Sequence, residues 1–232
     1  MDLNTLWFVL VAVLFSGFFV LEGFDYGVGV LLPFVARTDQ ERRRVINTIG
    51  PVWDGNEVWI ITGGGAIFAA FPHWYATLFS GFYLALFVIL LALIVRGVSF
   101  EFRSKHRAPA WRATWDRAIF VGSLLPAVLW GTALANLLKG VPIDPSKTFT
   151  GSLLDLLSPY TLLAGLAVLA VFVTHGAIFL NLRSTDPIRE RSHRIAQWAG
   201  PTAAVLVLLF SAGTRIGTDA RGIGSLLVLS LI

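Results

Sequence analysis

The chain has 232 residues, of which 56% are hydrophobic and 14% are charged, and it contains no cysteine. A soluble domain of this length could not hide so much apolar surface in one core, which excludes a soluble globular protein. The lack of cysteine excludes disulfides, iron–sulfur clusters and thiolate metal sites. The net charge of +4 could suggest nucleic-acid binding, but the basic residues lie beside apolar segments, so we expect no nucleic-acid partner.

Most Lys and Arg residues fall into three clusters, at residues 37–44, 96–117 and 183–194. The positive-inside rule places all three clusters in the cytoplasm. Two apolar segments separate each cluster from the next, and the N-terminal segment before the first cluster has no Lys or Arg. The sequence therefore predicts an outside N-terminus and six spans. Because no positive residues open the chain, we interpret its first apolar segment as a retained span and not a signal peptide.

The predicted spans cover about residues 6–34, 52–71, 75–95, 119–138, 159–182 and 196–213. The polar, glycine-rich stretch 22–29 predicts a tilt or a local distortion of the first span. Pro72 and His73 predict a tight external turn between the second and third spans. The charged segment 96–117 predicts a wet cytoplasmic loop. The expected fold is an all-α integral membrane protein built as a helical bundle.

Two units follow from these spans. Residues 1–138 are expected to form an N-terminal four-helix bundle, and residues 139–232 a partial second bundle of two spans plus a tail. The tail from Thr214 is too short and too polar at its start to predict a further span.

Acidic residues inside predicted spans are the main functional signal, and they are Glu22, Asp25, Asp54 and Glu57. A carboxylate near the middle of a membrane costs about 2.5–3.5 kcal/mol on insertion scales and requires a partner or water. The i, i+3 spacing puts both members of each pair on one helix face, so the two spans are expected to share a polar interior. Since carboxyl groups accept and release protons, we predict a proton relay from the cytoplasmic surface. In the alternative, these acids cap helix turns or pair with arginines such as Arg37 or Arg96.

Small and aromatic residues surround these acids. Gly23 and Gly27 have the small-xxx-small spacing that lets another helix approach closely, either within the chain or from a partner. Trp53 and Trp59 flank the second acidic pair, where they are either interfacial anchors or part of a partner contact. These four residues are the candidates for a partner interface.

Haem in a membrane bundle usually takes His or Met as axial ligands. Met1 is the only methionine, and His73, His106 and His193 fall in turns or loops, which leaves His175 as the only histidine in a span. One histidine cannot supply a bis-His haem, although it could supply one axial ligand. The sequence shows no catalytic Ser/His/Asp arrangement, phosphate-binding loop or metal-spaced cluster. We therefore predict no catalytic residue, no metal site and no cofactor bound by this chain alone.

Six ordered blocks of the sequence carry a family resemblance, at residues 23–29 (GFDYGVG), 51–59 (PVWDGNEVW), 63–70 (GGGAIFAA), 79–83 (FSGFY), 100–105 (FEFRSK) and 136–142 (NLLKGVP). They resemble subunit II of the cytochrome bd quinol oxidases. The resemblance implies a haem-free, multi-pass subunit in the cytoplasmic membrane of a bacterium or archaeon. It also implies that Asp25 and Asp54 belong to a proton route or polar network facing a partner.

The partner that the resemblance implies is a haem-bearing subunit I with b- and d-type haems, beside membrane lipids and a small single-span accessory subunit. The complex would oxidise quinol and reduce oxygen to water, electrogenically, with proton uptake from the cytoplasm. The family pattern has eight spans in two bundles, whereas six are found here, so an incomplete second bundle is expected. The alternative hypotheses are a proton-coupled transporter and a non-functional fragment of the oxidase subunit.

Overall fold

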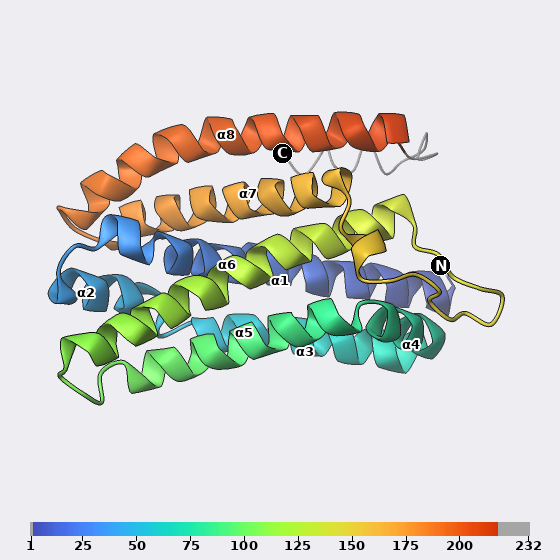
Figure 1. The fold of residues 1–232 in the computed structure, drawn as a ribbon, viewed down its shortest axis with the longest axis horizontal. Coiled ribbons are helices and arrows are strands. Elements are labelled where there is room, and N and C mark those ends of the chain that lie inside the picture. Colours follow the sequence, from blue (N-terminus) through green and yellow to red (C-terminus); the bar gives the residue numbers. More distant parts are fainter. Residues whose placement is uncertain (1, 218–232) are drawn as a thin grey trace.

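A computed structural model describes residues 2–217 of the chain. These residues form α1 (Leu3–Val35), α2 (Asp39–Ile49), α3 (Trp53–Ala70), α4 (Pro72–Gly81), α5 (Tyr83–Phe102), α6 (Pro109–Lys139), the 3-10 helix η1 (Leu154–Leu156), α7 (Pro159–Arg183) and α8 (Ile188–Gly217). Figure 1 shows α1 and α6 in the middle of the bundle, with α7 and α8 on one side and α3, α4 and α5 on the other. Most of the predicted tail, residues 218–232, lies outside the described residues.

Five helices of the described part, α1, α5, α6, α7 and α8, are long and apolar enough to cross a membrane. They confirm the prediction of an all-α membrane protein built as a helical bundle. Helix α3, predicted as the second span, has 18 residues but a lower hydropathy, because polar side chains fill its first turns. It nevertheless lies lengthwise against α1. The count of six spans and the outside N-terminus stay predictions.

The basic segments gather at one end of the bundle. Helix α2, the α5–α6 loop and the α7–α8 connection lie at the same end in Figure 1, opposite the N-terminus and α4. This is the arrangement that the charge clusters predict. The division into bundles at residue 138 stays a prediction, and α7 packs against both α1 and α6 across that boundary.

The connection between α3 and α5 differs from the prediction. Instead of a tight turn, the ten-residue helix α4 begins at Pro72, where proline suits the first turn of a helix. Ring stacking of Tyr75 on Phe79, with centroids 4.1 Å apart, supports this short helix. Helix α5 therefore begins later than expected and continues to Phe102.

The predicted loop over residues 96–117 is also much shorter than expected. Helix α5 extends through Arg96, and α6 already begins at Pro109, again with proline in its first turn. Helix α1 continues unbroken through residues 22–29, where the sequence predicts a tilt or local distortion. The glycines there let neighbouring helices approach closely, and they do not interrupt α1.

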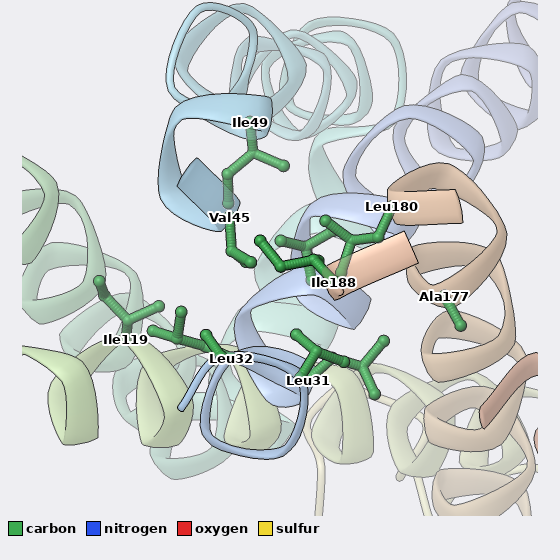
Figure 2. Packing of buried hydrophobic residues seen from close by; sticks show 11 residues of the cluster. Leu31, Leu32, Val45, Ile49, Ile119, Ala177, Leu180 and Ile188 are labelled. Carbon is green, nitrogen blue, oxygen red and sulfur yellow. The ribbon is translucent and has the colours of Figure 1, made fainter. Parts of the chain in front are cut away.

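A buried apolar cluster joins the basic end of the bundle (Figure 2). Val45 and Ile49 of the amphipathic helix α2 are buried together with Leu32 of α1, Leu180 of α7 and Ile188 of α8. Since α2 places its apolar face on this cluster, its arginine-rich face is left toward the surface.

Ion pairs also stabilise the basic end of the bundle. Arg103 binds both Asp116, through two nitrogens, and Asp39 at 2.9 Å. Arg42 contacts Asp116 at 2.8 Å, and Arg112 contacts Asp39 at 2.6 Å. Burial disfavours the charged guanidinium of Arg103, but the bonds to both carboxylates outweigh it, so the pKa of Arg103 is raised. Arg103 therefore stays charged and joins the end of α5 to α2 and α6.

Glu41 of α2 provides a testable contact outside the spans. Its carboxylate accepts the backbone N–H of Arg37 at 2.6 Å and Nη1 of Arg191 at 2.8 Å, and it completes a capping box with Thr38. The Arg37 backbone hydrogen bond is the largest cause that holds the pKa of Glu41 below its usual value. We expect Glu41→Gln to lower the unfolding free energy by about 1 kcal/mol at pH 7.

Because the folded pKa of Glu41 is lower than the unfolded one, its contribution is complete above the unfolded value, about 4.5. It is lost as the pH falls through the folded value. Thermal unfolding in detergent should therefore show a larger difference between wild type and Glu41→Gln at pH 7 than at pH 3. Glu190→Gln, which removes an exposed 3.5 Å pair with Arg194, is the control and should change little. An equal effect of Glu41→Gln at both pH values would contradict this assignment.

Candidate functional site

The middle of α1 places a polar face inside the protein. Glu22, Asp25 and Tyr26 are fully buried, although the same helix is largely exposed nearer its N-terminus. Their spacing of three and four residues puts them on one side of the helix. As predicted from the sequence, Glu22 and Asp25 share a face that points into the bundle.

Arg96 of α5 is the counter-charge of this face. Its side chain is fully buried, and Nη1 donates to Oε1 of Glu22 and, at 2.7 Å, to Oε1 of Glu57 on α3. The guanidinium carbon also lies 4.9 Å from the centroid of the Tyr26 ring. One arginine thus holds carboxylates from two helices, as a buried charge requires.

Asn56 of α3 completes the buried cluster. Its side-chain amide donates to Oδ2 of Asp25 at 2.7 Å and more weakly to the Leu21 carbonyl at 3.3 Å. Within the described residues, Oε2 of Glu22 and Oδ1 of Asp25 are buried and receive no hydrogen bond. Nε and Nη2 of Arg96 are also buried without a hydrogen-bond partner there, and a chemical role is one explanation for such buried polar atoms.

Three of the four acids predicted from the sequence, Glu22, Asp25 and Glu57, lie in this cluster. Asp54 does not join them, because it lies exposed in the first turn of α3. The alternative of arginine pairing is right for Glu22 and Glu57, whose partner is Arg96.

Sequence reasoning missed Asn56 and placed Arg96 in a loop. The apolar side chains of Val98, Phe100 and Phe102 were the available signal that the helix continues past Arg96. For Asn56, the signal was an uncharged polar side chain directly before Glu57 in a span.

Comparison with known proteins identifies the family. Residues 3–232 match the family model of cytochrome bd terminal oxidase subunit II. The chain belongs to this family. This confirms the resemblance seen in the six sequence blocks, and the match includes the whole cluster around Arg96.

Curated relatives give the same result. The chain is 46% identical over 218 residues to cytochrome bd ubiquinol oxidase subunit 2 of Bacillus subtilis, covering 94% of this chain and 64% of that protein. It is 48% identical over 199 residues to a probable cytochrome oxidase subunit 2 of Haemophilus influenzae, covering 84% and 53%. It is 43% identical over 221 residues to cytochrome bd-I ubiquinol oxidase subunit 2 of Escherichia coli, covering 94% and 58%. The chain spans less than two thirds of the length of these relatives.

The glycine pair of this subunit II chain contacts α7. A Cβ atom on Gly27 would collide with the backbone of Phe172 and Gly176, and one on Gly23 would come within 2.8 Å of the Phe172 ring. Gly176 in turn has no room for a Cβ beside Gly27. These glycines therefore serve the packing of α1 on α7 within the chain, which is one of the two roles that their spacing allows.

The tryptophans flanking Asp54 and Glu57 are half-buried against neighbouring helices. Trp53 lies over Gly97 of α5 and 5.1 Å from the ring of Phe100, measured between centroids. Trp59 packs against Gly17 of α1. Both rings thus pack against neighbouring helices on either side of the buried cluster.

An oxidase of the bd family implies haems in the complex, and the histidines of this chain do not fit a bis-His haem site. The prediction that His73 and His193 fall in turns or loops is wrong, because His73 lies in α4 and His193 in the first turns of α8. His106 lies between α5 and α6, and His175 lies in the long apolar helix α7. The His175 ring meets the ring of Phe24 edge-on, 5.5 Å away. Within residues 2–217, no group of three or more His, Cys, Asp or Glu side chains could hold a metal ion.

Proposed function

We propose that this chain acts as the haem-free subunit of a bd-type quinol oxidase in a bacterial or archaeal cytoplasmic membrane. A subunit I with b- and d-type haems is its partner, beside membrane lipids and a small single-span accessory subunit. The complex oxidises quinol and reduces oxygen to water. Family membership and the ubiquinol oxidase activity in the names of two relatives support this proposal.

The buried cluster supports a second part of the proposal, that this chain takes up protons from the cytoplasm. Glu22, Asp25 and Glu57 face a single cation, Arg96. If all three carboxyl groups are ionised, the cluster carries two uncompensated negative charges in a low-dielectric interior, which is costly. Uptake of one proton halves that excess. The cluster can therefore gain and lose a proton while Arg96 and Asn56 hold its geometry.

The positions of the acids give the relay a direction. Asp54 lies exposed at the start of α3, and Glu57 lies one turn further into the bundle, half-buried and bound to Arg96. Glu22 and Asp25 are fully buried on α1. We place the entry at Asp54, the transfer through Glu57 and the buried end at Glu22 and Asp25. The half-buried Trp53 and Trp59 of α3 are the proposed contacts to subunit I.

Asp25→Asn tests the relay with little change in shape, because an amide oxygen can still accept the Asn56 hydrogen bond. We expect quinol oxidase turnover of the assembled complex to fall about 100-fold, the lower end of what a positioned proton-transfer group contributes. Asp54→Asn should also lower turnover, but less, since an exposed entry group can be bypassed by water. Turnover is measured as quinol-dependent oxygen consumption per haem.

The matched control is Glu190→Gln, an equally conservative change at an exposed acid of α8. It should leave turnover unchanged. The visible spectrum of each purified complex shows that subunit I and its haems are present. An assembled Asp25→Asn complex with normal turnover would remove Asp25 from the relay. A chain that purifies colourless and alone would instead favour the transporter hypothesis, which predicts pH-dependent uptake by this chain in liposomes.

A further inference from the structure

An apolar groove runs between α5 and α6 on the outside of the bundle. Its volume is about 330 Å³, within the range of small-molecule sites. The lining consists of Val88, Leu91, Ala92 and Val95 from α5 and Arg117, Ala118, Val121, Gly122 and Leu125 from α6. All of these residues except Arg117 are apolar or glycine.

The groove arises from small residues between larger ones. A Cβ atom on Gly122 would lie 2.8 Å from both the Ala92 carbonyl oxygen and the Cβ of Arg96, so the two helices touch there. Larger side chains lie on both sides of this contact. Val121 and Leu125, on the α6 side, are 46% and 38% exposed. The result is a groove with an apolar lining, which suits a hydrocarbon chain.

Arg117 is the charged end of the groove. It lies nearest the start of α6, and Val95 opposite it lies nearest the end of α5, so this end faces the basic end of the bundle. Its neighbours Arg103 and Arg112 are neutralised by carboxylates, whereas Arg117 is exposed and makes no ion pair within the described residues. An arginine at this depth keeps its charged head near the lipid headgroups while its stem follows the apolar surface.

We propose that this groove binds one acyl chain of an anionic glycerophospholipid from the cytoplasmic leaflet, with the lipid phosphate on Arg117. The groove follows α5 from Val88 to Val95, a rise of seven steps or about 10 Å at 1.5 Å per residue. That length fits within one leaflet, which is half of a hydrocarbon core about 30 Å thick. The uncompensated guanidinium complements the phosphate and favours lipids with net negative charge.

Lipid analysis of the purified full-length protein tests this site. The protein is extracted in mild detergent, and bound phosphatidylglycerol and phosphatidylcholine are counted by mass spectrometry after incubation with equal amounts of both. We expect wild type to retain phosphatidylglycerol preferentially. Arg117→Gln should reduce that retention at least fivefold. The separate variant Arg117→Lys, which keeps the positive charge, should keep most of it. Val121→Trp, which fills the groove without changing charge, should reduce retention of both lipids.

Arg43→Gln is the matched control, because Arg43 is exposed on α2 away from the groove. It should leave lipid retention unchanged. Equal loss of bound lipid from Arg43→Gln and Arg117→Gln would mean that the effect arises from general surface charge. That result would overturn the site. Equal retention of both lipids by wild type would overturn the preference for anionic lipid.

A protein helix could cover the same groove, and a second measurement separates that outcome. The chain has no cysteine, so Val121→Cys offers a unique thiol. Added phosphatidylglycerol should slow the labelling of this variant by a maleimide when the isolated chain is in detergent, and phosphatidylcholine should slow it less. A thiol that both lipids leave equally reactive in detergent, but that is protected in native membranes containing the partner, would show that a partner protein occupies the groove. That result would overturn the proposal.

Discussion

Arg96→Met should prevent the folded protein from accumulating in the membrane. The substitution leaves Glu22 and Glu57 without their shared guanidinium inside the bundle. Removing one partner of a buried ion pair typically costs about 3–5 kcal/mol, because the remaining charge stays desolvated. Such a loss is a large part of the 5–15 kcal/mol that stabilises an ordinary domain. The measurement is the amount of monodisperse protein recovered by size-exclusion chromatography in mild detergent.

A triple variant distinguishes the effect of the unpaired charges from the effect of the changed side-chain shape at position 96. Arg96→Met combined with Glu22→Gln and Glu57→Gln removes the unpaired carboxylates while keeping side chains of similar size. We expect this triple variant to recover part of the folded yield but not the oxidase activity. Arg43→Met, on the exposed face of α2, is the control and should fold normally. Normal folding of Arg96→Met alone would mean that the carboxyl groups do not depend on Arg96.

Gly27→Ala should separate α1 from α7. The added Cβ atom would collide with the Phe172 carbonyl group, and Gly176 on the facing helix approaches the Gly27 backbone equally closely. Backbone atoms cannot move aside as a side-chain tip can, so the helices must shift and strain their other contacts. We expect a loss of about 3 kcal/mol, the upper end of ordinary overpacking costs. Thermal unfolding in detergent, followed by circular dichroism, measures it.

Gly64→Ala is the matched control for this change. Gly64 lies in the middle of α3, and a Cβ atom there would meet nothing within 4 Å. Because alanine favours a helix over glycine by about 1 kcal/mol, this variant should be as stable as wild type or more stable. If Gly27→Ala and Gly64→Ala behave alike, the crossing of α1 and α7 is looser than the structure indicates.

The features predicted correctly depend on local chemistry. Long apolar segments between basic clusters indicate membrane helices, because an unpaired backbone or charge in hydrocarbon is costly. The spacing of Glu22 and Asp25 places both on one helix face whatever surrounds α1. The ordered blocks around these acids also identify the family without any three-dimensional information. The bounds of α5, α6 and α8 were less predictable, because these helices continue past charged residues that find partners, and α8 already begins at Ile188.

The sequence by itself thus determined the helical membrane class, the buried acids of α1 and the family. Only the tertiary structure decided which residues meet: Arg96 reaches Glu22 across 74 positions of the chain, and Asn56 reaches Asp25 across 31. It also separated Asp54 from the acids with which it was grouped, since the start of α3 is exposed. Spacing along a helix specifies a shared face. The partner of that face depends on the packing of whole helices, where close crossings at small residues such as Gly27 and Gly122 set the positions of long side chains.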